Sequence, residues 1–303
     1  MSCSTLVNHD DVTDIVRNML RQEVTTYRRI DYLATELRCV TDNEVIDGCW
    51  RQRIIEWMYG VVDHCNLRRE SVAVATYFLD LSASRGLVRC RRDFQLVAMT
   101  SLMLSIKLND STSVKLDSMV KLGRGLFNEA DVIAMETEML HVLDWHVHPP
   151  TPVCFMRQLL RLLPPETSAI ARYMIMEVTR FISEVSTCIY KFIKYSSSSM
   201  SMAAMKISME RIDTAIFPRE QSDRFLQSVS SFTGIDYYGE AVARAADELR
   251  ASLENNVNLQ DLMTTIDAQC HRVSGGLMQK LPADVEMHEI GLHSPRDVSS
   301  STI

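Results

Sequence analysis

The chain has 303 residues, 46% of them hydrophobic and 23% charged, with a formal net charge of −7 at pH 7. This length allows two domains of ordinary size, and the composition is typical of a soluble globular protein. The acidic balance argues against DNA or RNA as the main partner, because nucleic-acid binding normally rests on a basic surface.

Composition also favours helices. Only 10 Gly and 8 Pro are present, too few for the tight turns that many short strands would need, so we expect an all-α fold. The eight cysteines form no CxxC pair, which predicts a reducing, intracellular compartment. No apolar stretch approaches the ~20 residues that span a membrane, and none resembles a secretory signal. We therefore expect no membrane contact.

The first elements in chain order are two predicted helices. One covers Val12–Leu37 and belongs to an N-terminal helical extension, residues 1–48. The other begins at Trp50, where apolar residues recur at spacings of three and four and so share one face. These residues predict a core-facing stripe: Ile54, Trp57, Met58, Val61, Val62 and Cys65.

Three further helices complete a predicted first bundle, residues 49–148. After a helix at 71–83, the segment 93–107 is apolar on nearly every side, which predicts a buried central helix. A short helix ends before Gly123. Another begins at Asn128, a good N-cap with an acidic residue three positions later, and runs to about residue 143.

A second bundle is predicted for residues 149–265. Thr151-Pro152 reads as an N-cap followed by proline at the first helical position. Further helices are expected at 168–193, at 199–211, after Pro218 and at 240–255. The remaining residues, 266–303, are expected to form a flexible tail.

No catalytic motif is present: the sequence lacks a Gly-rich phosphate loop, HExxH and GxSxG. We therefore expect no catalytic residue, no metal site and no cofactor, and conclude that the chain is not an enzyme. Glu136 lies on the apolar stripe of its helix, together with Ile133 among others, where a carboxylate needs a partner. That partner could be internal or belong to another protein. Lys107 ends the most apolar helix, where a lysine also complements the helix dipole.

Several segments resemble the cyclin box. WRQRIIEW (Trp50 to Trp57) is similar to the family's MRxxLxDW helix, and YFLD (Tyr77 to Asp80) is similar to its NYLD segment. FQLVAMTSLMLSIKLND resembles the LQLVGxTxLxxAxKxEE helix. VIAMETEMLHVLDWHVHPPTPVCFMRQLL resembles the MExxxLxxLxFxLxxPTPxxFL stretch, and FIKYSSSSMSMAAM the KYxPSxxAAAA helix of a second cyclin fold. The resemblance therefore implies two consecutive five-helix cyclin folds.

The resemblance implies a regulator that binds a cyclin-dependent kinase, activates it by packing on the kinase's C-helix, and controls cell-cycle progression in the nucleus and cytoplasm. In that family the residues aligned with Lys107 and Glu136 grip the kinase backbone. Apolar kinase contacts are implied for Leu104, Leu108, Leu140, Trp145 and Val147. A docking groove for RxL-type substrates or inhibitors is implied for Trp50, Arg51, Arg53, Ile54, Trp57 and Gln95.

Two departures and three alternatives accompany this reading. Arg53 stands where the groove usually has an apolar residue, and Asn109-Asp110 replaces the acidic pair that follows the lysine. A cyclin-fold transcription factor predicts a basic face, and a helical enzyme predicts a pocket beside Glu136 with a histidine. A cyclin-like scaffold without kinase activation is the third alternative.

Overall fold

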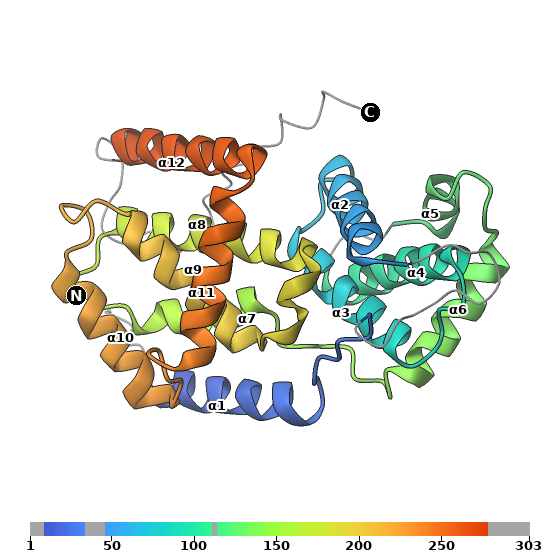
Figure 1. The fold of residues 1–303 in the computed structure, drawn as a ribbon, viewed down its shortest axis with the longest axis horizontal. Coiled ribbons are helices and arrows are strands. Elements are labelled where there is room, and N and C mark those ends of the chain that lie inside the picture. The colour runs from blue at the N-terminus through green and yellow to red at the C-terminus, as the bar shows by residue number, and fades with distance from the viewer. Residues whose placement is uncertain (1–8, 34–45, 111–113, 278–303) are drawn as a thin grey trace, which may run out of the picture. The chain divides into compact units, whose positions relative to one another are not determined.

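The structure is a computed structural model that describes residues 9–33, 46–110 and 114–277. Within these residues all regular secondary structure is helical (Figure 1), which confirms the all-α fold class. The elements are α1 (His9–Thr25), α2 (Gly48–His64), α3 (Glu70–Ser84), α4 (Arg91–Asn109), α5 (Leu116–Leu122), α6 (Glu129–Val142), α7 (Pro152–Leu159), η1 (Leu160–Leu162), α8 (Ala169–Cys188), η2 (Tyr190–Lys194), α9 (Ser197–Arg211), α10 (Arg219–Thr233), α11 (Glu240–Glu254) and α12 (Val257–Leu277).

The chain divides into two compact units. Among the described residues, unit 1 is formed by residues 9–16, 156–182 and 199–277, and unit 2 by residues 17–33, 46–110, 114–155 and 183–198. Two successive sets of five α-helices, α2 to α6 and α7 to α11, follow α1, as the resemblance predicted. In the described part of the chain, none of these helices combines the length and apolar composition that a membrane span requires.

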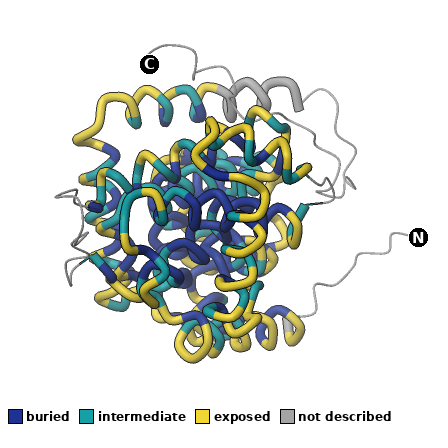
Figure 2. Tube along the Cα trace, turned by 90° about the vertical axis from the view of Figure 1, so that its right-hand side faces the viewer, coloured by how far each residue is buried: buried dark blue, intermediate teal, exposed yellow. Residues whose placement is uncertain are grey.

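Helix α4 forms the centre of unit 2. It packs against α2, α3, α5 and α6, and every residue from Leu96 to Ile106 is buried. Figure 2 shows such buried stretches in dark blue, enclosed by exposed segments in yellow. A helix without a polar face gains most from burial on all sides, so the predicted central position of residues 93–107 is confirmed.

Side-chain caps set two helix starts where the sequence predicted them. The Asn128 side chain accepts from the Asp131 backbone N–H, and the Asp131 carboxylate accepts from the Asn128 N–H, each at 3.0 Å. This reciprocal capping box begins α6. The Thr151 hydroxyl accepts from the Cys154 N–H at 3.2 Å and caps α7.

The predicted helix Val12–Leu37 is wrong beyond Thr25, where α1 ends. Two β-branched threonines, Thr25 and Thr26, lower the helix propensity there. The following non-helical segment buries Tyr27 and Tyr32 in the core of unit 2, which a continuing helix would not do for both. Residues 34–37 of the predicted helix lie outside the described residues.

The C-terminal elements differ from prediction in two places. Helix α8 ends at Cys188, and a 3₁₀ turn, η2, replaces the predicted helical stretch up to residue 193. A further helix, α12, covers part of the tail predicted from residue 266. Its apolar spacing was visible in the sequence, because Leu259, Met263 and Ile266 fall four and three residues apart, and the last two are buried. Residues 278–303 lie outside the described residues.

Candidate functional site

The structure brings Lys107 and Glu136 together at the surface of unit 2. Lys107 lies in the last turn of α4, and Glu136 lies on α6, which packs against α4. The Lys107 Nζ donates to both carboxylate oxygens of Glu136, at 2.6 and 2.9 Å. The lysine side chain is 53% exposed and the glutamate 16%. The carboxylate on the apolar stripe thus has an internal partner, although the pair remains open to water.

The sequence left open whether the partner of Glu136 is internal or belongs to another protein, and this pairing answers only part of that question. An exposed ion pair contributes about 0 to 1 kcal/mol to stability, so the fold does not depend on it. Both side chains are nevertheless held in one geometry, with lysine protons and carboxylate lone pairs still accessible. The pair can therefore offer donors and an acceptor to another protein without further ordering of the free chain.

Exposed apolar side chains accompany the pair. Leu108 follows Lys107 directly and is 38% exposed, and Trp145 in the turn after α6 is 66% exposed. Leu140 and Val147 are half-buried. Leu104 is only 3% exposed, so in this structure it offers a partner almost no surface and belongs to the core around α4.

Ile133 belongs to the same exposed apolar group, and the sequence assigned it to the buried stripe of α6. It is 52% exposed and precedes Glu136 by three residues, one turn along the same helix face. The buried residues of α6 are Val132 and Met139. The only signal in the sequence was the position of Ile133 at the edge of the predicted apolar arc.

A strained turn presents Trp145. Asp144 and Trp145 both have positive φ, 49° and 59°, a region that residues other than glycine occupy rarely. Arg85 stabilises the turn, because its Nη1 donates to the Val142 carbonyl at 2.9 Å and to the Asp144 carboxylate at 3.1 Å. Strain of this kind persists where surrounding contacts over-determine it. The tryptophan therefore projects from a fixed backbone.

The side chain of Asp110 is directed into unit 2. Asn109-Asp110 is the pair that stands where the cyclin box has two acidic residues after the lysine. Its carboxylate accepts from the Ser71 hydroxyl at 2.8 Å and from the Arg68 Nε at 3.1 Å. The Asp110 side chain is only 6% exposed. This carboxylate stabilises the contact between α4 and the start of α3, and it adds little to the surface beside Lys107.

Three of the six predicted groove residues meet at one cavity. Ile54 and Trp57 from α2 and Gln95 from α4 line a groove of about 190 Å³, which residues 122–124 and 126–127 close on the other side. Trp50 does not line it. Its ring packs edge-on against Phe94, with centroids 6.4 Å apart, and lies below the Arg91 guanidinium.

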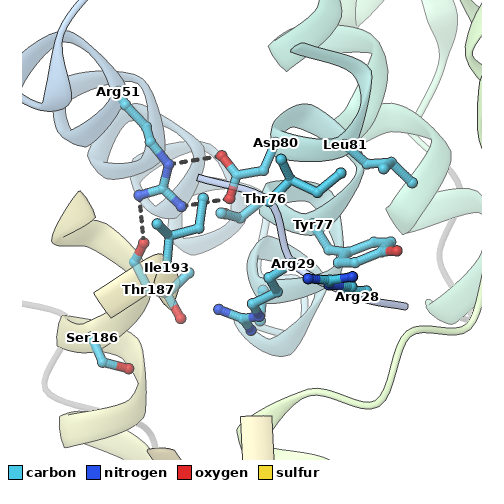
Figure 3. A pocket seen from close by; sticks show the side chains of 12 residues that line it. Arg28, Arg29, Arg51, Thr76, Tyr77, Asp80, Leu81, Ser186, Thr187 and Ile193 are labelled. Carbon is cyan, nitrogen blue, oxygen red and sulfur yellow. Dashed lines mark hydrogen bonds and ion pairs between the residues drawn. The ribbon is translucent and has the colours of Figure 1, made fainter. Parts of the chain in front are cut away.

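Arg51 is wrong as a groove residue. It is 2% exposed, and its Nε and Nη2 donate to the two oxygens of Asp80 at 2.8 and 2.7 Å (Figure 3). Its Nη1 donates to the carbonyls of Thr187 and Cys188, the last residues of α8, at 3.1 and 3.3 Å. Burial disfavours the charged guanidinium, but the Asp80 carboxylate outweighs burial and raises the pKa of Arg51.

The Arg51 contacts also satisfy the C-terminal end of α8. The last carbonyls of a helix have no hydrogen-bond donor within the helix. The Arg51 guanidinium donates to two of these carbonyls in α8. The Tyr32 hydroxyl donates to the same Asp80 carboxylate at 3.1 Å. Arg51 therefore joins α2, α3 and the end of α8 inside unit 2. Its function is structural.

Arg53 lies beside the groove without lining it. It is exposed and precedes Trp57 by four residues, so the two side chains are neighbours on the surface of α2.

Among the residues that the structure describes, no three His, Cys, Asp or Glu side chains are placed to hold a metal ion.

The helix arrangement defines a class: two successive five-helix folds of the cyclin type. A viral cyclin from herpesvirus saimiri superimposes with a TM-score of 0.60 at 12% identity, over 78% of this chain and 96% of that one. A chain of the CAK complex from Chaetomium thermophilum bound to ATP-gamma-S superimposes with a TM-score of 0.51 at 13% identity, over 92% and 90% of the two chains. At these identities the likeness concerns the fold.

The sequence comparisons identify the family. The model for the cyclin N-terminal domain matches residues 14–148, and the model for the cyclin C-terminal domain matches residues 150–253. The chain belongs to the cyclin family, whose members are regulatory proteins.

Individual relatives are distant. G2/mitotic-specific cyclin-2 of Medicago sativa is 23% identical over 59% of this chain and 53% of its own length. Cyclin-B2-2 of Oryza sativa subsp. indica is 25% identical over 59% and 41%, and G2/mitotic-specific cyclin-B3 of Drosophila melanogaster is 23% identical over 63% and 31%. The matched region thus spans about half or less of the length of these relatives.

Proposed function

We propose that this chain binds a cyclin-dependent serine/threonine kinase, activates it by packing on the kinase's C-helix, and thereby controls cell-cycle progression. One observation carries the proposal: a preformed Lys107–Glu136 pair at the surface, accompanied by exposed Leu108, Ile133 and Trp145. Exposed apolar groups beside a charged, hydrogen-bonding pair are typical of a protein-binding surface.

The activation mechanism follows from how kinases work. A kinase needs an ion pair between a lysine and a glutamate of its C-helix to position ATP. A partner that binds the inward position of that helix more tightly than the outward one shifts the population toward the active state. The Lys107–Glu136 pair would hold the helix end through charge-assisted hydrogen bonds. Trp145, Ile133 and Leu108 would cover its apolar residues.

The test is co-purification of the chain with cyclin-dependent kinase catalytic subunits, followed by a phosphorylation assay. We expect Lys107→Ala, Glu136→Ala and Trp145→Ala each to weaken kinase binding by about 2 kcal/mol, roughly thirtyfold. The folded fraction should stay unchanged. Matched controls are Glu240→Ala and Arg244→Ala, which break an exposed i,i+4 pair on α11 in unit 1. Undiminished kinase binding by all three site variants would contradict the proposed surface.

The same assay tests the scaffold alternative. The internal use of Asp110 removes one carboxylate from the surface beside Lys107, and this favours weaker engagement of a kinase than the family pattern implies. Binding without a rise in phosphorylation would identify a scaffold. The proposal includes residence in the nucleus and cytoplasm, which imaging of a fluorescently tagged chain would check.

A further inference from the structure

A small polar cavity lies within unit 2, apart from the Lys107–Glu136 surface. Its walls come from the non-helical segment after α1, from α2 and α3, and from the end of α8 and η2 (Figure 3). Its volume is about 20 Å³, which admits about one or two groups of the size of a water molecule. Arg28 lines the cavity and is exposed, so the cavity is reached from the surface beside this side chain.

The guanidinium of Arg29 borders the cavity with most of its donors unused. Its Nη2 donates to the Ser197 hydroxyl at 3.1 Å, and no other hydrogen bond of Arg29 is present among the residues that the structure describes. A guanidinium has five N–H donors, so most of them lack a protein acceptor. Burial lowers the pKa of Arg29, and the nearby carboxylates do not restore it. The charged side chain therefore lacks full compensation within the protein.

Two further groups that line the cavity have no partner in the described part of the chain. The Thr76 hydroxyl is buried and makes no hydrogen bond. In Figure 3 every dashed interaction between the lining residues involves Arg51, and none reaches Arg28 or Arg29. Unpaired polar groups around a cavity indicate a bound water or ion.

Carboxylates near the cavity keep their charge and must be counted. Asp80 lines the cavity and pairs with Arg51. Glu23 does not line it but acts electrostatically on Arg29. The three arginines Arg28, Arg29 and Arg51 thus face two carboxylates, an excess of one positive charge. Since this excess is small, the preference for an anion rests on the unused donors of two arginines.

Phosphate matches these donors better than a carboxylate does. Guanidinium groups pair with both anions through parallel hydrogen bonds. A carboxylate has only two oxygens, whereas a phosphate monoester has three free oxygens and about −1.5 to −2 charge at pH 7. One phosphate can therefore place oxygens in the cavity and leave another at its mouth.

We infer that this cavity binds a phosphate group, with oxygens inside against Arg29 and a further oxygen at the mouth against Arg28. The phosphate belongs to a phosphorylated serine or threonine side chain or to free phosphate, since both present the same chemistry. The inference does not depend on the proposed kinase contact, because its residues lie outside that surface. It can therefore be tested on the chain alone.

The experiment measures fluorescence anisotropy of fluorescein-labelled Gly-Ser-Gly-X-Gly-Ser-Gly peptides with the full chain, where X is phosphoserine, Glu or Ser. We expect the phosphoserine peptide to bind at least about tenfold more tightly than either of the others, because charge-assisted hydrogen bonds to its three oxygens are lost in both. Competition with sodium phosphate then distinguishes the two sources. Displacement at concentrations similar to the peptide Kd assigns the cavity to free phosphate, and displacement only far above it assigns the cavity to a phosphorylated side chain.

Two variants test the named arginines. Arg29→Met and Arg28→Met should each weaken binding of the phosphoserine peptide by about tenfold or more. Arg29→Met should leave the melting temperature unchanged or higher, because a desolvated guanidinium with unused donors does not stabilise the fold. Arg28→Met alters an exposed side chain and tests the cavity without disturbing the core. Arg244→Met, on α11 in unit 1, is the matched control and should bind the peptide as the wild type does.

Three outcomes would overturn the inference. Equal binding of the phosphoserine and Glu peptides would show that the cavity does not select phosphate. Absence of binding by the phosphoserine peptide and by sodium phosphate would show that the cavity holds water alone. Undiminished binding by both Arg28→Met and Arg29→Met would place any phosphate site elsewhere on the chain.

Discussion

Two ion pairs of unit 2, Arg51–Asp80 and Lys107–Glu136, differ more than their residue types suggest. Each pair joins two helices, and in each the cation donates to both carboxylate oxygens. The Arg51 and Asp80 side chains are 3% and 12% exposed, whereas those of Lys107 and Glu136 are 53% and 16% exposed. A desolvated charge must keep its partner, and a hydrated one need not. The carboxylates are similarly buried, so the difference lies in the cations: the buried Arg51 belongs to the fold, and the exposed Lys107 is available for the proposed kinase contact.

The largest expected effect tests the buried pair. Arg51→Ala should lower the free energy of unfolding by about 3 to 5 kcal/mol, because Asp80 would remain buried without its cation. Urea denaturation monitored by circular dichroism measures this loss. Replacing both partners, as in Arg51→Met with Asp80→Leu, should recover most of the stability. A loss below about 1 kcal/mol for Arg51→Ala would contradict the structural role.

Three buried tyrosines should also give unit 2 an alkaline limit. Burial, and then the Asp80 carboxylate, raises the pKa of Tyr32, and burial raises that of Tyr59 and brings the pKa of Tyr77 to about 12. These tyrosines lose their protons near pH 10 in the unfolded chain but keep them when folded. The contribution of these tyrosines to stability is therefore fully present below pH 10 and is lost above it, by up to about 1.4 kcal/mol per pH unit for each tyrosine.

Unfolding free energies at pH 9, 10 and 11 measure this slope. Tyr32→Phe should make it shallower, because one protonated group is removed, and Tyr238→Phe serves as the exposed control. An unchanged slope in Tyr32→Phe would mean that Tyr32 ionises alike in both states.

The smallest expected effect concerns the exposed pair. Lys107→Ala should change the free energy of unfolding by less than about 1 kcal/mol, since water replaces the lysine around Glu136. The loss of unfolding free energy in Arg51→Ala should therefore be at least about three times the loss in Lys107→Ala. A loss of several kcal/mol in Lys107→Ala, measured under the same conditions, would show that the two pairs are alike and that the exposed pair is structural.

Sequence periodicity predicted the number and order of the bundle helices, because apolar spacing and capping residues act locally. The capping box of α6 and the central position of α4 follow directly from Asn128 and from the apolar segment 96–106. The resemblance selected Lys107, Glu136, Trp57 and Gln95, but it could not give their exposure.

How deeply a side chain is buried depends on packing between segments distant in the sequence, and the sequence failed to predict this burial. Arg51 was expected in a groove because its motif contains groove residues, yet its partners lie 29 to 137 residues away in the sequence. No local pattern reveals such a contact. Ile133 was assigned to the core for a related reason: an apolar arc shows which residues are apolar, and only the neighbouring helices decide which of them are covered.

The Arg51 contacts have a consequence for how the chain is made. Arg51 precedes its acceptors Thr187 and Cys188 by 136 and 137 residues. At the roughly 5 to 20 residues per second of protein synthesis, the ribosome adds these acceptors on the order of ten seconds after the arginine. Unit 2 cannot complete its core before residues 183–198 emerge, although most of its helices are already synthesised. The nascent N-terminal helices therefore wait with one charged group incompletely bonded, an interval in which a chaperone could act on them.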